Sequence, residues 1–125
     1  MIRLSKEIVK QLHQLMADET GGAVGVRDDG LLESALEGIF QTFDGKELYR
    51  TLEERGARLG YMLITNHAFI DGNKRIGMLA LLTFLEANGV VLNCSNEDVS
   101  ETGIDIASGR MGYADLCKWI LTHEV

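Results

Sequence analysis

Two long apolar segments with helical spacing lie in the middle of this chain, separated by a short polar stretch. The first covers residues 49–66 and contains Gly56 and Gly60, small residues that let another element approach closely. The second runs from Ile76 to a stop signal at residues 88–89 and is apolar on nearly every side. A helix that is apolar all round is buried. The fold must therefore surround this second helix with other elements.

The remaining helices follow ordinary start and stop signals in a chain that has no proline. Ser5 is an N-cap for a first amphipathic helix that ends before Gly21, and a loop follows. Further short helices are expected at residues 31–39, 95–107 and 113–121. Gly103 weakens the pattern of one of them. Residues 40–48 contain an Asp-Gly pair, which indicates either a hairpin or flap, or an irregular connector.

The fold class expected from these patterns is all-α, with about six helices and room for one small β-hairpin. With 125 residues, the chain suits one domain covering residues 1–125. Its hydrophobic content of 46% with 25% charged residues is typical of a globular protein. We expect no membrane span and, since the N-terminus has no signal-peptide pattern, a cytoplasmic location. The net charge of −7 argues against direct nucleic-acid binding.

Three side chains outside the polar stretch are candidates for chemistry. Cys94 and Cys117 form neither a metal-ligand spacing nor a disulfide framework, so we interpret them as ordinary reduced thiols. His13 lies close to the apolar stripe of the first helix. A packed or half-buried histidine is the favoured interpretation there, and a ligand is the alternative.

The polar stretch itself, residues 67–75, reads His-Ala-Phe-Ile-Asp-Gly-Asn-Lys-Arg and opens the buried helix. Free backbone N–H groups and the positive end of the helix dipole make such a start favourable for an anion. Gly72 lets the backbone approach a ligand closely, Asn73 can donate through its amide, and Lys74 and Arg75 supply positive charge. The pattern predicts a phosphate site.

Two further residues extend this prediction. Asp71 places a carboxylate beside the predicted phosphate site, and Mg²⁺ is usually bound by one or two carboxylates together with phosphate oxygens. His67 is able to take a proton from an attacking hydroxyl near neutral pH. The structural alternative is a helix start capped by Asp71 or Asn73, with the charged groups solvated. Phe69 and Ile70 are expected to pin the loop to the core. A zinc site is a poorer hypothesis, because no third ligand is placed by spacing.

These nine residues resemble the signature of the Fic/Doc family, His-Pro-Phe-x-(Asp/Glu)-(Gly/Ala)-Asn-(Gly/Lys)-Arg, with Ala68 in place of proline. The proline's absence removes a rigid constraint on the loop and leaves the chemical residues intact. Further similarity to the short Doc, or death-on-curing, branch of the family covers most of the chain from about Gly21 to Gly89. It is clearest at residues 31–36, 41–49 and 84–89.

The resemblance implies an all-helical Fic fold that transfers part of a nucleoside triphosphate, here ATP with Mg²⁺, to a protein hydroxyl. His67 would be the base and Asp71 would hold Mg²⁺. The phosphates would be bound by Gly72, Asn73, Lys74 and Arg75. Residues 40–48 would be a flap that aligns the target segment through backbone hydrogen bonds.

Lys74 bears on the class of reaction. Most Fic proteins have glycine at this position and transfer AMP, whereas the resemblance to Doc implies a reversed nucleotide and transfer of the γ-phosphate. It further implies a bacterial toxin that is paired with an antitoxin and acts on elongation factor Tu. Protein adenylylation and a non-catalytic Fic-fold binding module are the alternatives.

The family's inhibitory pattern, Ser/Thr-x-x-x-Glu-(Gly/Asn), does not occur, because no Ser or Thr is followed four residues later by Glu. We therefore expect inhibition to come from another chain.

Overall fold

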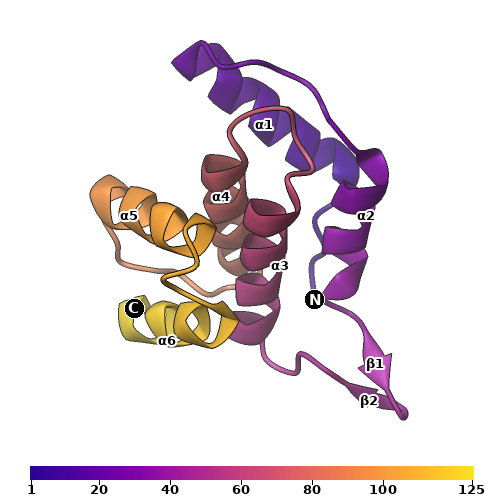
Figure 1. The fold of residues 1–125 in the computed structure, drawn as a ribbon. Coiled ribbons are helices and arrows are strands. Elements are labelled where there is room, and N and C mark those ends of the chain that lie inside the picture. The colour runs from indigo at the N-terminus through magenta and orange to yellow at the C-terminus, as the bar shows by residue number, and fades with distance from the viewer.

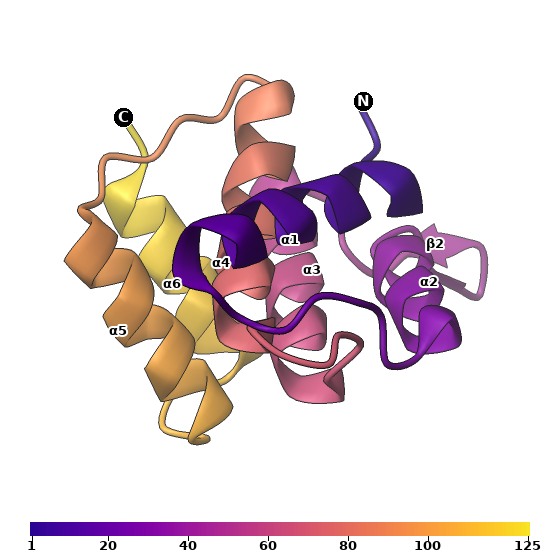
Figure 2. The ribbon, with the colours of Figure 1, turned by 90° about the horizontal axis from the view of Figure 1, so that it is seen from above.

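Six helices and one small hairpin make up the structure, a computed structural model that describes residues 1–125. The elements are α1 (Lys6–Thr20), α2 (Asp29–Gly38), β1 (Thr42–Phe43), β2 (Lys46–Glu47), α3 (Leu52–Asn66), α4 (Asn73–Ala87), α5 (Asn96–Ala107) and α6 (Tyr113–His123). In both Figure 1 and Figure 2, α3 and α4 lie in the centre, with α5 and α6 on one side and α2 on the other. The expected all-α class is confirmed, and no helix is long and apolar enough to cross a membrane.

The central pair α3 and α4 pack backbone against backbone through glycines. A Cβ atom added at Gly77 would lie 2.5 Å from Cγ1 of Ile64 and 3.0 Å from the carbonyl oxygen of Gly60. One added at Gly60 would lie 2.8 Å from Cδ1 of Leu81. The second apolar segment is buried as predicted, with Ile76, Met78, Leu81 and Phe84 at 1% exposure or less. This close crossing fixes the end of α3 relative to the start of α4, where residues 67–72 connect them.

Helix ends follow the signals in the sequence. The Ser5 side chain accepts a hydrogen bond from the N–H of Ile8, and Gly21 ends α1 in the left-handed conformation. Ser95 and Asp98 form a capping box at the start of α5. Hydrogen bonds from the backbone and the side chain of Ser95 hold the pKa of the Asp98 carboxyl below its usual value.

Residues 40–48 form the hairpin rather than an irregular connector. Thr42 pairs with Glu47 and Phe43 with Lys46. Asp44 and Gly45 at the turn both have positive φ, 53° and 76°, which is the pattern that an Asp-Gly pair favours in two-residue hairpins. The hairpin projects away from the helices (Figure 1), and an ion pair of 3.0 Å joins its Glu47 to the buried guanidinium of Arg55 on α3.

The glycine that weakens the α5 pattern lies where α5 packs against α4. A Cβ at Gly103 would lie 3.4 Å from the carbonyl oxygen of Lys74, so α5 approaches the first turn of α4 closely at this point. The helix continues through Gly103 to Ala107. At this point α5 lies beside the predicted phosphate site.

Candidate active site

The predicted base lies at the end of α3 in an unusual backbone conformation. His67 is the C-cap of this helix, with φ 54° and ψ 51°, in the left-handed region. For a residue with a Cβ this conformation costs about 1–2 kcal/mol, so the surrounding structure must hold it in place. The imidazole is exposed and takes part in none of the hydrogen bonds or ion pairs of the structure. It is free to accept a proton from a bound molecule.

The loop after His67 is fastened to the α1–α2 loop by backbone hydrogen bonds. Two consecutive N–H groups, of Arg27 and Asp28, donate to the carbonyl of Ala68 at 2.8 and 3.0 Å. The N–H of Ile70 donates to the carbonyl of Gly25 at 3.2 Å. The glycine-rich loop that follows α1 therefore supports the predicted site, a role that its sequence did not indicate.

Side chains complete this attachment at the end of α3. Arg27 donates from Nε to the carbonyl of His67 at 2.6 Å and from Nη2 to the carbonyl of Asn66 at 3.1 Å. The Asn66 side chain accepts from the N–H of Ala68 at 3.1 Å and donates to the carbonyl of Leu31 at 3.0 Å. The turn that carries His67 is thus held from α2 and from the α1–α2 loop.

His13 supports the loop from α1. It is 2% exposed, and its ring stacks on Phe69 with the centroids 4.1 Å apart and the planes at 14°. Its Nε2 lies 2.7 Å from the carbonyl oxygen of Asp71; since a carbonyl only accepts, Nε2 is the protonated ring nitrogen. The packed interpretation of His13 is confirmed. Its hydrogen bond to the 67–75 loop was not predicted. The only indication of it in the sequence is the position of His13 beside the apolar stripe of the first helix.

Phe69 and Ile70 differ in what they do. Phe69 is 1% exposed and pins the loop to the core as expected. The same expectation for Ile70 is wrong, because its side chain is 58% exposed. The N–H of Ile70 donates to the carbonyl of Gly25 in the α1–α2 loop. With the backbone held in this way, the side chain of Ile70 faces solvent.

The Asn73 amide is engaged within the protein. Its Oδ1 accepts from the N–H of Phe69 and its Nδ2 donates to the carbonyl of the same residue, both at 3.0 Å. This pair of bonds closes the loop onto the first residue of α4. The contact of Asn73 with phosphate remains a prediction. In the structure the Asn73 side chain stabilises the loop through its two bonds to Phe69.

The Asp71 carboxylate lies at the mouth of the loop and is exposed. Its Oδ1 accepts from the N–H of Gly72 at 2.8 Å and its Oδ2 from the N–H of Ala23 at 3.3 Å. A Cβ at Gly22 would lie 3.1 Å from Oδ2, so a larger residue there would displace the carboxylate slightly. Each oxygen has further lone pairs directed at solvent.

The first turn of α4 offers unused donors and positive charge. Gly72 is the N-cap in the left-handed conformation and makes no side-chain cap hydrogen bond. The N–H groups of Asn73, Lys74 and Arg75 have no acceptor in the protein. The side chains of Lys74 and Arg75 are exposed and take part in no ion pair. Donors and cations together make this helix start a suitable site for an anion.

A groove of about 1100 Å³ runs past this helix start, between α1, α4 and α5. In Figure 2, α1 crosses α4 while α5 lies beside it. Four of the predicted site residues line the groove: Asp71, Gly72, Lys74 and Arg75. His67 and Asn73 do not line it. The structure therefore gathers the predicted metal ligand and most of the predicted phosphate site in one groove, with the predicted base at the other end of the same loop.

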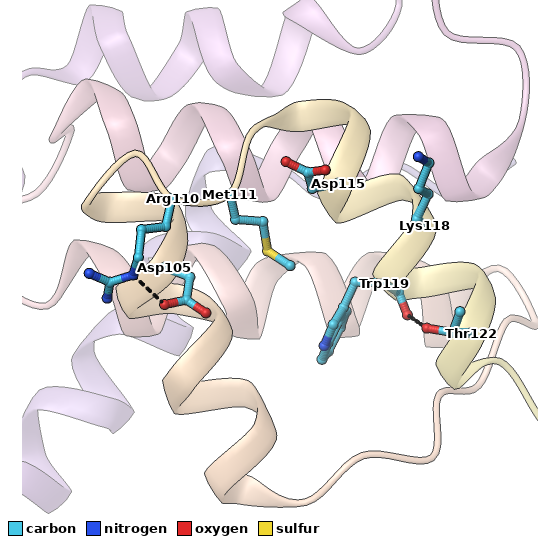
Figure 3. A pocket seen from close by; sticks show the side chains of 7 residues that line it. All are labelled: Asp105, Arg110, Met111, Asp115, Lys118, Trp119 and Thr122. Atoms are coloured by element: carbon cyan, nitrogen blue, oxygen red, sulfur yellow. Dashed lines mark hydrogen bonds and ion pairs between the residues drawn. The ribbon is translucent and has the colours of Figure 1, made fainter.

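A second, shallower depression of about 410 Å³ lies at the α5–α6 corner (Figure 3). It combines the half-buried ring of Trp119 with the Asp105–Arg110 ion pair of 3.1 Å and two further charged residues of opposite sign. It contains neither a histidine nor a cysteine. We therefore assign the candidate site to the groove at α4.

The two thiols are poor candidates for nucleophiles. Burial raises the pKa of both Cys94 and Cys117 above the ordinary value of a cysteine. Both are therefore mainly protonated near neutral pH. The interpretation of both as ordinary thiols agrees with their half-buried, unpaired state.

Comparison with known families decides the assignment of the fold. The family model described as the Fic/DOC family matches residues 3–85, which include the loop, the hairpin and most of α4. This chain belongs to the Fic/DOC family. Among curated proteins, this Fic/DOC chain is similar to the protein named Toxin Doc of Mycolicibacterium smegmatis (strain ATCC 700084 / mc(2)155), with 44% identity over 72 residues. The match covers 58% of this chain and 55% of that relative, so the chain spans about half the relative's length. The resemblance seen in the sequence is confirmed.

Proposed function

We propose that this Fic/DOC protein is a Doc-like toxin that transfers the γ-phosphate of ATP to a hydroxyl group of a translation factor, with elongation factor Tu as the target. The observation that carries the proposal is the start of α4. An uncapped helix N-terminus, two unpaired cations and a carboxylate meet there in one groove, and an unpaired histidine ends the preceding helix.

The residues present fit ATP and Mg²⁺. The protein has no group of three His, Cys, Asp or Glu side chains that could hold a metal by itself. A single carboxylate is nevertheless typical of Mg²⁺ that arrives with phosphate oxygens and water. Asp71 would hold the metal, and Gly72, Lys74, Arg75 and the first-turn N–H groups of α4 would bind the phosphates, with Asn73 fixing the loop. Bound Mg²⁺ would neutralise phosphate charge.

His67 would act on the acceptor. Its imidazole takes the proton of the attacking hydroxyl, whose oxygen forms a bond to the γ-phosphorus while the bond from that phosphorus to the β–γ bridging oxygen breaks. ADP leaves with the bridging oxygen, and the proton remains on His67 until solvent removes it. Because the imidazole has no partner in the protein, its proton-accepting nitrogen is available for this step.

The hairpin would align the target segment. Its residues are exposed, Phe43 at 75%, and β1 and β2 pair only with each other, so an outer edge offers main-chain donors and acceptors to an extended peptide. Addition of a strand to such an edge fixes the register of a peptide regardless of its side chains. A translation factor as target would place the reaction in the cytoplasm.

ATP labelled at either the α or the γ position tests the class of reaction. We expect purified protein with Mg²⁺ to transfer γ label, and no α label, to elongation factor Tu. Transfer of α label would instead establish protein adenylylation. Transfer of neither, with elongation factor Tu present, would favour a non-catalytic binding module.

Replacement of Lys74 by glycine is expected to weaken γ transfer by about tenfold or more, since an exposed cation at the anion site is removed. The same change frees space beside the helix start and is expected to permit some α transfer. Both labels are measured in parallel on the variant. Lys118→Gly on α6 is the matched control, because it removes an exposed helical lysine that does not line the groove. Unchanged γ transfer in Lys74→Gly would contradict the role of Lys74.

Inhibition would come from an antitoxin in trans. The printed sequence has no match to the family's inhibitory pattern, and the groove carries exposed apolar side chains of Leu15 (64%) and Ile104 (47%) beside the charged helix start. A partner segment with apolar and acidic side chains would cover both features.

A further inference from the structure

We infer that Arg27 is a positioning residue that holds the base His67 in its working orientation. The inference rests on the proposed function, in which His67 takes the proton of the acceptor hydroxyl. Arg27 lies in the α1–α2 loop, forty residues before the base along the chain.

One residue supplies donors to three consecutive carbonyls. Arg27 donates from Nη2 to Asn66 at 3.1 Å, from Nε to His67 at 2.6 Å and from its backbone N–H to Ala68 at 2.8 Å. The first two carbonyls are at the C-terminal end of α3, where carbonyls lack partners within the helix and the dipole is negative. A guanidinium suits this place because its donors form a rigid fork.

This arrangement acts on the orientation of the imidazole. The ring of His67 makes no hydrogen bond, so its direction depends on the conformation of the backbone that carries it. That backbone is left-handed, a conformation that residues other than glycine rarely adopt. Without Arg27, the carbonyls of residues 66 and 67 would turn to water and the His67 backbone would be free to leave this conformation.

A purely structural role is the competing explanation, in which Arg27 only stabilises the end of α3. The two roles differ in what they change. A stabilising contact alters the melting temperature and leaves the rate per folded molecule intact. A positioning contact lowers kcat while the KM for ATP stays constant, because Arg27 does not line the groove that holds the nucleotide.

The experiment compares Arg27→Ala and Arg27→Lys with Arg110→Ala, which removes an exposed arginine from its ion pair with Asp105 at the α5–α6 corner. We expect Arg27→Ala to lower kcat by about 10- to 100-fold, since displacement of a catalytic group by about 1 Å has effects of this size. The KM for ATP should stay within about twofold of the wild type. Arg27→Lys should recover part of the lost rate, because the ammonium keeps the charge without the fork. Arg110→Ala should match the wild type. Wild-type kcat in Arg27→Ala, or a rate loss fully accounted for by its unfolded fraction, would overturn the inference.

Amide hydrogen exchange separates failure of this inference from failure of the proposed function. If the wild type transfers α label instead of γ label, the same kcat comparison applies, because the acceptor hydroxyl still needs a base. If the wild type transfers neither label, the proposed function fails and exchange decides alone. Faster exchange at His67 and Ala68 in Arg27→Ala, with the centre of α3 unchanged, supports positioning. Equal exchange at these two amides overturns it.

Discussion

His67→Ala is expected to lower the rate of phosphate transfer by at least about 100-fold, the lower end of what a positioned general base contributes. The side chain is exposed and makes no hydrogen bond, so its removal leaves no buried group without a partner. Affinity for ATP and the melting temperature should therefore stay close to those of the wild type. Single-turnover transfer of γ label and nucleotide binding by calorimetry measure the two effects separately.

His123→Ala is the matched control, since it removes another histidine, one that contacts Trp119 within α6. It should transfer at the wild-type rate. A wild-type rate for His67→Ala would show that another group takes the proton.

Gly77→Val is expected to lower the free energy of unfolding by about 3 kcal/mol, the upper part of the usual range for overpacking a core. Even the first added carbon would lie 2.5 Å from Ile64 and 3.0 Å from the Gly60 carbonyl, and a backbone atom cannot move aside as a side chain does. The central helices would have to separate. Urea unfolding followed by circular dichroism measures the change.

Gly38→Ala supplies the comparison for this prediction. Gly38 is also helical, the last residue of α2, but no atom would lie within 4 Å of its added Cβ. The alanine should be neutral or stabilising by about 0.5–1 kcal/mol, because it restricts the unfolded chain. If both variants unfolded at the same urea concentration, the close crossing of α3 and α4 would not be a source of stability.

Elements set by neighbouring residues were predictable from the sequence. Ser5 and Gly21 delimit α1, and the Asp44-Gly45 pair forms the hairpin turn, because a cap or a turn depends on residues only a few positions apart. The burial of α4 followed from its apolar composition alone. Polar residues at the start of a buried helix likewise identified the 67–75 loop.

Contacts between distant residues were not predictable. His13 reaches the carbonyl of Asp71 and Arg27 reaches that of His67 across long separations in sequence, and no local pattern encodes either pairing. Ile70 was misjudged for the same reason, since its direction is set by a backbone bond to Gly25. The sequence therefore yielded a prediction of which side chains carry chemistry, and the structure adds the contacts that hold the loop bearing them.

The hairpin and the proposed phosphate site are held by separate contacts. The hairpin is joined to the start of α3 through Glu47 and Arg55, whereas the 67–75 loop is held by α1 and by the α1–α2 loop at the other end of α3. Substitutions in the exposed residues 42–47 therefore leave the contacts of the loop untouched. If the proposed roles hold, residues 42–47 can change with the target protein while the contacts that position the proposed nucleotide site stay as they are.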